Sequence, residues 1–388
     1  MPKTALSKQQ LGQFFTVNSD YVLQGLEKFV VGKNVTDPFA GSGDLLEWAI
    51  QFGAKKVKGF DIDHRLIDDK KIVFGDSLKE NRKYDFVLTN PPYLNINKAD
   101  QKTKESYFRK SRFEDLYQLS LNSILNSREG IVIVPINFLS AENSAKIRKI
   151  FFSNFKIIRM NYFRHQVFPD TTYNVIAFYY KSNGKGNEFN IETYLHPGNK
   201  KVRIKLEKRF DWTIGGGALQ NIKAQKNVLG VHRLSEKDIV SGNKQIKAAH
   251  NHVKTIIEVR VAGPLYKLIK SNIILLKAID SGSDEGKIAL EDIREYGLDC
   301  LISKETSRHM IYLVFKRPVS INEQEELIAI FNSEINKLRE DHLSLFMTNY
   351  RDKDRKRISF DFVYRLINQL YFSNIAKEKV SKQQLSLV

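Results

Sequence analysis

The stretch with the most specific chemistry is DFVLTNPPYLNI, which runs from Asp85 to Ile96. In it an asparagine and two prolines follow an apolar run that is typical of a strand. Proline restricts its own backbone and that of the residue before it, so this corner is stiff. Asn90 offers a side-chain carbonyl oxygen and Pro91 offers a backbone carbonyl oxygen. The corner therefore presents two rigid hydrogen-bond acceptors close together.

Two fixed acceptors suit a reaction at the exocyclic amine of a base. Such an amine has two N–H donors, and its lone pair is delocalised into the ring. Acceptors that bind both hydrogens favour a pyramidal nitrogen whose lone pair is free to attack, and stiff acceptors pre-organise that transition state. Tyr93, three residues after Asn90, can stack on the ring. The corner predicts nitrogen chemistry on a planar amine.

Three acidic residues end the three strand-like runs before this corner. Asp37 opens DPFAGSGDLLEWAI, Asp61 lies in VKGFDID, and Asp76 lies in IVFGDSL. Gly41 and Gly43 let the backbone approach a ligand closely, and a helix that begins near residue 44 offers free N–H groups. An acid about 20 residues after such a loop is placed to bind ribose hydroxyls. We expect Asp76 to accept a hydrogen bond from an adenine amino group.

The elements that must position these residues alternate between strands and helices. Seven apolar runs between residues 34 and 180 are typical of strands, and amphipathic segments such as FEDLYQLSLNSIL and SAENSAKIRKIFF separate some of them. This alternation predicts an α/β fold with a doubly wound, mostly parallel sheet that binds ligands at the carboxyl ends of its strands. The polar, glycine-containing KSNGKGN predicts a linker. We expect a catalytic domain over residues 1–185 and an α+β domain over residues 186–388.

The composition favours a polyanion as partner. The formal net charge is +18, and the excess is spread along the chain, with 26 Lys and Arg against 19 Asp and Glu up to Tyr180 and 36 against 25 after it. Nucleic acid is the natural partner for such a balance, although a merely basic protein is the alternative. Cys300 is the only cysteine, which argues against a disulfide framework and a cysteine metal cluster. With no apolar run of membrane-spanning length and no signal peptide pattern, we expect a cytoplasmic protein.

In that order, DPFAGSG, the acid of GFDID, GDSL and NPPY resemble the motifs of S-adenosylmethionine-dependent amino-methyltransferases. The Asn form of NPPY in the DNA enzymes of this family is associated mainly with adenine N6. LGQFFT, from Leu11 to Thr16, resembles the family's N-terminal cofactor motif, and QVFPDTTYNVIAF, from Gln166 to Phe178, resembles a later motif with an aromatic that stacks on the base. The motif order is similar to that of the gamma class of N6-adenine DNA methyltransferases.

The resemblance assigns roles residue by residue. Its catalytic positions are Asn90, Pro91, Pro92, Tyr93 and Phe168. Its cofactor positions are Gln13, Phe14, Phe15, Thr16, Asp37, Pro38, Phe39, Ala40, Gly41, Ser42, Gly43, Asp61, Ile62, Asp76, Ser77 and Asn90. Two of these assignments have structural alternatives, since Phe168 could be core packing and Phe14 with Phe15 could form a helix-entry staple.

The function implied by the resemblance is methyl transfer from S-adenosylmethionine to N6 of an adenine that has left duplex DNA. The product is S-adenosylhomocysteine, and no metal is required. The enzyme would be the modification half of a restriction-modification system, with a separately encoded endonuclease as its counterpart. The closest alternative is an RNA base methyltransferase. A protein glutamine-amide methyltransferase and a non-catalytic DNA-binding subunit are further alternatives.

Beyond Tyr180 the expectations are general. The basic runs at residues 200–209 and 350–357 are candidate DNA-binding segments, although the second could be a solvated face, and residues 304–310 and 347–350 have side chains suited to base edges. The HNH at residues 250–252 is more typical of a solvated loop than of a nuclease. The DEGK at residues 284–287 follows a turn rather than a strand, so it is a weak nuclease candidate.

Overall fold

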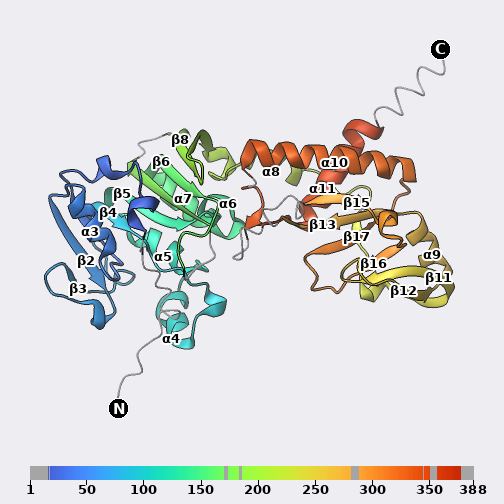
Figure 1. Ribbon diagram of the computed structural model, residues 1–388, viewed down its shortest axis with the longest axis horizontal. Coiled ribbons are helices and arrows are strands. Elements are labelled where there is room, and N and C mark those ends of the chain that lie inside the picture. The colour runs from blue at the N-terminus through green and yellow to red at the C-terminus, as the bar shows by residue number, and fades with distance from the viewer. Residues whose placement is uncertain are drawn as a thin grey trace, which may run out of the picture. The chain divides into compact units, whose positions relative to one another are not determined.

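The computed structural model describes residues 16, 18–169, 174–182, 186–280, 288–343, 345–349 and 356–376. The chain forms two compact units (Figure 1), of which the first extends to Gly216 and the second begins at Gly217. In the described part of the chain, no helix is both long enough and apolar enough to cross a membrane.

The first unit is built on a nine-stranded sheet. Its strands are β1 (Asn34–Asp37), β2 (Lys56–Asp61), β3 (Ile72–Phe74), β4 (Tyr84–Thr89), β5 (Ser127–Pro135), β6 (Phe155–Phe163), β7 (Val175–Ser182), β8 (Glu188–His196) and β9 (Lys200–Glu207). They lie in the order β3-β2-β1-β4-β5-β7-β6-β8-β9. The five strands from β3 to β5 are parallel neighbours, and β6 pairs in parallel with β8, whereas β7 and β9 run antiparallel to their neighbours. The predicted α/β fold with a mostly parallel sheet is confirmed.

The chain reverses its direction of travel between β1 and β4. From β1 it proceeds through helix α3 (Asp44–Gln51) to β2 and β3, and it then returns to β4 on the other side of β1. It continues through α5 (Leu116–Ser123) to β5. Since crossovers between parallel strands are right-handed, α3 and α5 lie on opposite faces of the sheet. The carboxyl ends of β1 and β4 therefore flank a topological switch point, where such sheets bind ligands.

The centre of this sheet is apolar because helices cover it. Strand β7 is buried from Val175 to Tyr180, and β4 has a single exposed residue, Asp85. Strands buried on both faces are nearly continuous apolar runs rather than alternating ones, as in these sequences. The remaining helices of the first unit are α2 (Ser19–Val22), α4 (Gln101–Thr103), α6 (Asn137–Ser140) and α7 (Ala145–Asn154).

The boundary expected between residues 185 and 186 does not coincide with the edge of the first unit. Strand β8 lies beside β6 in register, from Arg159 opposite Glu192 to Phe163 opposite His196, and β9 pairs with β8. The KSNGKGN segment thus connects two strands of one sheet. The unit continues to Gly216 because these two strands complete the sheet.

The second unit combines small sheets with helices, as the α+β prediction requires. Its sheets have the orders β10-β17-β13-β15, β12-β11-β16 and β14-β19-β18. The strands are β10 (His232–Arg233), β11 (Ser241–His250), β12 (Ile257–Val261), β13 (Ile274–Lys277), β14 (Ile279–Asp280), β15 (Ala289–Asp292), β16 (Cys300–Ile302), β17 (Met310–Val314), β18 (Thr348–Asn349) and β19 (Lys356–Arg357). The helices are α8 (Gly216–Lys223), α9 (Gly263–Lys270), α10 (Ile321–His342) and α11 (Phe360–Leu370).

Helix α10 shows how the sequence defines an element of this unit. It begins after Ser320, whose side chain accepts a hydrogen bond from the Glu323 N–H, while the Glu323 carboxylate accepts one from the Ser320 N–H. This reciprocal cap marks the start of a helix in the sequence. The apolar side of α10, with Leu327, Phe331 and Ile335 fully buried, packs into the larger core of the unit.

Candidate active site

The candidate site lies at the switch point, where β1 and β4 end side by side. Asp37 is the last residue of β1, and Asn90 directly follows β4. The two strands pair in parallel, with Val35 opposite Phe86 and Thr36 opposite Val87. Thr16, Asp37, Gly41 and Asn90 line one small hollow together with Phe39, Ala40, Asp44 and Leu45. Residues predicted from three separate motifs are therefore brought to one place.

The amide of Asn90 is held on both sides. Asn90 is 8% exposed, its Nδ2 donates to Thr16 Oγ1 at 3.1 Å, and its Oδ1 accepts from the Tyr93 hydroxyl at 2.5 Å. These partners orient the amide oxygen toward Tyr93 and its nitrogen toward Thr16. Pro91 is buried behind it, which keeps the corner rigid. Pro92, the second proline of the motif, is half-buried.

Tyr93 has a second hydrogen-bond acceptor within reach. Its hydroxyl lies 2.8 Å from the backbone oxygen of Ile133 in β5, and its ring is 4% exposed. A phenolic hydroxyl has one hydrogen, so it can donate to Asn90 or to Ile133 but not to both at once. A shift of that hydrogen to Ile133 increases the capacity of Asn90 Oδ1 to accept from another donor. In this conformation the ring is packed rather than open for stacking.

The glycine loop after β1 has the backbone that the sequence predicts. Gly41 has φ 55° and Gly43 has φ 88°, in the left-handed region that favours glycine. A Cβ on Gly43 would lie 3.1 Å from Ile72 Cδ1. Helix α3 begins immediately after Gly43, and the Ser42 hydroxyl donates to the Asp44 carboxylate. Pro38 is buried and Phe39 is half-buried beside this turn.

Asp37 is a buried carboxyl group within the site. It is 1% exposed, and its Oδ1 accepts from the Thr89 hydroxyl at 2.6 Å and from the Phe39 N–H at 3.0 Å. Burial disfavours the charged form and raises the pKa of Asp37 to about 7, because these two hydrogen bonds offset only part of the desolvation. Burial therefore favours the neutral form of this carboxyl group.

Asp61 joins the end of β2 to the glycine loop. Its Oδ2 accepts from the Gly41 N–H at 2.9 Å, and its Oδ1 accepts from the Asp63 N–H at 2.8 Å. Burial raises its pKa as well, and these bonds oppose that shift. The Ile62 N–H also acts on this carboxylate, so of about four lone-pair positions one remains for a hydroxyl group of a ligand. Ile62, the next residue, is half-buried.

Asp76 lies after β3, as predicted, but its side chain already has partners. Its Oδ2 accepts from the Tyr107 hydroxyl at 2.9 Å and lies 3.4 Å from Lys79 Nζ. An adenine amino group would have to share or displace the Tyr107 hydroxyl. Ser77 is 1% exposed, and its hydroxyl accepts from Arg82 Nη1 at 2.9 Å.

Three expected cofactor residues lie outside the described part of the chain, whereas the expected base clamp, Phe168, lies within it. Gln13, Phe14 and Phe15 lie outside the described residues, so their cofactor role stays a prediction. Phe168 is 1% exposed, and its backbone oxygen accepts from Gln166 Nε2 at 2.9 Å. A base could stack on the Phe168 ring only after local movement, so its role as a clamp also stays a prediction.

The other candidates contribute no catalytic geometry. The HNH residues form the end of β11 and a turn, in which Asn251 has φ 59° and its side chain accepts from the Lys304 N–H. Among the described residues no group of His, Cys, Asp and Glu is arranged to hold a metal ion. The DEGK segment and residues 350–355 lie outside the described part of the chain.

Two partners of the site were not found from the sequence. Thr89 holds Asp37 across 52 positions, and Tyr107 holds Asp76 across 31. Thr89 directly precedes the NPPY motif at the end of a parallel strand, and this position is the feature from which its role could have been predicted. Tyr107 lies in an irregular helical segment and gives no comparable signal.

One family model matches part of the first unit. Residues 16–168 match the family model described as Eco57I restriction-modification methylase. This match confirms the resemblance to restriction-modification methyltransferases over that segment. No curated protein matches the chain.

Similar solved structures share parts of the fold. A modification subunit of a putative type I restriction enzyme from Vibrio vulnificus has 16% identity and a TM-score of 0.40, with 64% of this chain and 59% of that chain covered. A type I methyltransferase subunit from Streptococcus thermophilus has 18% identity, a TM-score of 0.35, and coverage of 50% and 52%. A putative RNA methyltransferase from Pyrococcus horikoshii has 19% identity, a TM-score of 0.34, and coverage of 46% and 90%. The chain thus spans little more than half of the two type I subunits, and at these scores we draw neither substrate nor partner from them.

Proposed function

We propose that the chain, whose residues 16–168 are a restriction-modification methylase domain, transfers a methyl group from S-adenosylmethionine to N6 of adenine in duplex DNA. The observation that supports this most is the hollow at the switch point, shared by Asn90 of the NPPY corner, the Gly41 turn and Asp37. It brings the NPPY corner, to which we assign the amine, next to the glycine turn, to which we assign the cofactor.

The residues present fit such a cofactor. Gly41 lines the hollow without a side chain, and the Asp61 carboxylate has a lone-pair position left for a ribose hydroxyl. Thr16 lies on the other side of the hollow, bonded to Asn90. The cofactor supplies a methyl group bound to a sulfonium, which is an electrophile for an amine nitrogen.

We assign the amine side of the reaction to the NPPY corner. The target adenine leaves the duplex because its amino group is out of reach within the stack. Asn90 Oδ1 and the Pro91 backbone oxygen accept the two amine hydrogens, and Tyr93 and Phe168 flank the ring. The nitrogen lone pair would then be free to attack the sulfonium methyl carbon, with the carbon–sulfur bond breaking and S-adenosylhomocysteine leaving. The methylated amine is cationic and acidic, so it loses its proton without a strong base.

The wider setting is part of the proposal. The second unit would read the DNA sequence around the target, and a separately encoded endonuclease would cleave the unmethylated site. Such a methyltransferase would act in the cytoplasm, where Cys300, which is buried and not in a disulfide, would stay reduced.

The nature of the acceptor tests the proposal. The purified chain is incubated with S-adenosylmethionine that carries a tritiated methyl group, and with either unmethylated duplex DNA or total RNA. We expect label in DNA and none in RNA. Label in RNA alone would contradict the proposal in favour of an RNA base methyltransferase, and label in neither would favour a non-catalytic subunit.

A further inference from the structure

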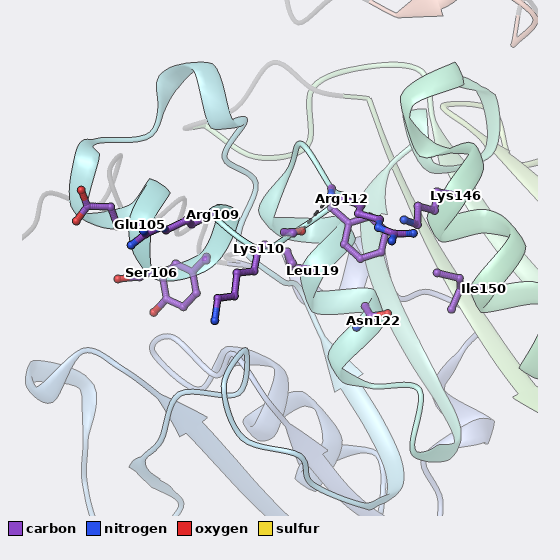
Figure 2. Close-up of a pocket in the computed structure, with 12 residues that line it drawn as sticks. Glu105, Ser106, Arg109, Lys110, Arg112, Leu119, Asn122, Lys146 and Ile150 are labelled. Carbon is purple, nitrogen blue, oxygen red and sulfur yellow. Dashed lines mark hydrogen bonds between the residues drawn. The ribbon is translucent and has the colours of Figure 1, made fainter.

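A basic groove lies in the first unit, and the residues that line it belong to neither of the basic runs at residues 200–209 and 350–357. It has a volume of about 700 Å³, and its walls come from the π-helical segment η4 (Lys104–Phe108) with the residues after it, from α5, and from α7 (Figure 2). Arg109, Lys110 and Arg112 line it from the segment after η4, and Lys146 lines it from the start of α7.

The four cations of this groove have little compensating charge. Glu105 is the one acid among the described residues that line it, and Glu105 accepts a hydrogen bond from Gln101 at 2.7 Å. Within the described part of the chain, none of the four cations forms an ion pair with an acid. Arg109, Lys110 and Arg112 are exposed, so their charges face solvent.

Arg112 and Lys146 approach each other from opposite walls (Figure 2). Partial burial and, after it, the Arg112 charge lower the pKa of Lys146. Lys146 Nζ also lies 5.8 Å from the centre of the Phe113 ring, within the range of a cation–π contact. Like charges held this close repel each other, and an anion bound between them would relieve that repulsion.

The basic run at residues 200–209 differs from the groove because several of its cations form ion pairs with acids. In β9, Lys201 Nζ lies 2.7 Å from Glu192 and Lys205 Nζ lies 2.9 Å from Glu188. Arg209, just after the strand, lies 2.6 Å from Glu207. Half of the six cations in that run therefore have an acid beside them, whereas none of the four groove cations has one within the described residues.

The groove is joined to the candidate active site by a short, braced segment. The chain leaves the NPPY corner and returns at Asp115, which forms a bridge with Asn95 at the base. Leu94, Phe108 and Leu116 form an apolar cluster inside the segment. Tyr107 lines the groove and donates to Asp76 at the cofactor side. The segment that carries Arg109, Lys110 and Arg112 is therefore ordered, and it begins at the NPPY corner.

We propose that this groove binds the phosphate backbone of duplex DNA beside the target base. The inference rests on the function proposed above. Four cations spread along an open groove suit a chain of phosphates better than one small anion. Ser111 and Asn122, which also line it, add neutral donors of the kind that bind phosphate oxygens.

The test compares two double variants of the full-length chain. Lys110→Gln with Lys146→Gln removes two charges from the groove. Lys55→Gln with Lys56→Gln removes two exposed charges at the amino end of β2, the edge of the sheet opposite the site. Affinity for a fluorescein-labelled, unmethylated duplex of mixed sequence is measured by anisotropy over a range of salt concentrations. Lys110→Arg with Lys146→Arg keeps the charge and serves as the rescue.

The groove variant should bind DNA more weakly, and the slope of log K against log salt should become shallower by about 0.9 for each phosphate that the protein no longer neutralises. The control and the arginine variant should match the wild type. Equal slopes in all four proteins would overturn the proposal, as would a weakening seen only with a matched RNA duplex. Because binding is read without methyl transfer, failure of the groove is distinguishable from failure of the proposed activity: a wild type that binds DNA through the groove but methylates nothing would contradict only the latter.

Discussion

At the scale of single residues, Asp61 carries the clearest cofactor prediction. Replacing Asp61 with Ala should weaken S-adenosylmethionine binding by about 1–3 kcal/mol, because the ribose hydroxyls and the Gly41 N–H lose their acceptor. Asp63→Ala is the matched control, since the Asp63 side chain pairs with Arg65 instead. Isothermal titration calorimetry gives the affinities, and an unchanged affinity in Asp61→Ala would remove Asp61 from the cofactor site.

Asp37 predicts a dependence of stability on pH. With its pKa raised to about 7, folded Asp37 keeps a proton between about pH 4 and 7 that the unfolded chain has released. The unfolded state then binds fewer protons, so this group makes the free energy of unfolding fall as pH rises through that window, by at most about 1.4 kcal/mol per pH unit.

Asp37→Asn should remove that fall. Both hydrogen bonds to Asp37 end on Oδ1, so an amide oxygen can keep them while the side chain stays neutral. Urea unfolding at pH 5 and pH 8 should show that the variant gains stability relative to the wild type at pH 8. Parallel pH profiles for the two proteins would contradict the raised pKa.

Phe168 allows its two roles to be separated. Because the side chain is 1% exposed, Phe168→Ala should lower the free energy of unfolding by about 3–5 kcal/mol. If the ring also clamps the extruded base, the variant should reduce the fluorescence rise of 2-aminopurine placed at the target position. An unchanged melting temperature would contradict the packing role, and normal flipping in the folded fraction would contradict the clamp.

At the scale of elements, the strand ends were predictable and their side-chain partners were not. Asp37, Asp61 and Asn90 could be placed because polar residues directly follow apolar runs, and parallel strands end at one edge. The bonds from Thr89 to Asp37 and from Tyr107 to Asp76 join residues far apart in the chain and form only in the packed fold. Local pattern does not contain that information.

The β8–β9 pair shows a second limit. The alternation of its residues correctly indicates two strands, but alternation does not specify which sheet a strand joins. The polar KSNGKGN segment before β8 has the composition of a linker and is the connection between β7 and β8. The boundary of the first unit depends on the pairing of β8 with β6, which is a contact between distant parts of the chain.

The Tyr107 hydroxyl joins the segment after the NPPY corner to Asp76, so its removal should loosen that segment. Tyr107→Phe should cost about 1.5–3 kcal/mol, the range for a hydrogen bond to a charged group, and should speed amide hydrogen exchange over residues 104–113. Tyr296→Phe, which removes a similar bond to Glu291, is the control for exchange at this segment. Equal exchange in the two variants would contradict the tie.

At the scale of the whole molecule, the net charge predicts a polyanionic partner but does not predict which surface binds it. The +18 excess is spread over both halves, and sequence density drew attention to residues 200–209. Folding pairs many of those charges with acids and leaves the groove at Arg109, Lys110, Arg112 and Lys146 uncompensated. Charge density along a chain therefore differs from charge density on a surface.

The proposed reaction depends on Asn90, which acts on an adenine amino group. The direct measurement is mass spectrometry of nucleosides from unmethylated duplex DNA after a single turnover with S-adenosylmethionine and either the wild type or Asn90→Ala. We predict N6-methyladenine from the wild type and, at saturating cofactor, a rate lower by about 10²-fold or more from the variant. A wild-type rate in Asn90→Ala would contradict the role of Asn90, and a methyl group on a base other than adenine would contradict the proposed reaction.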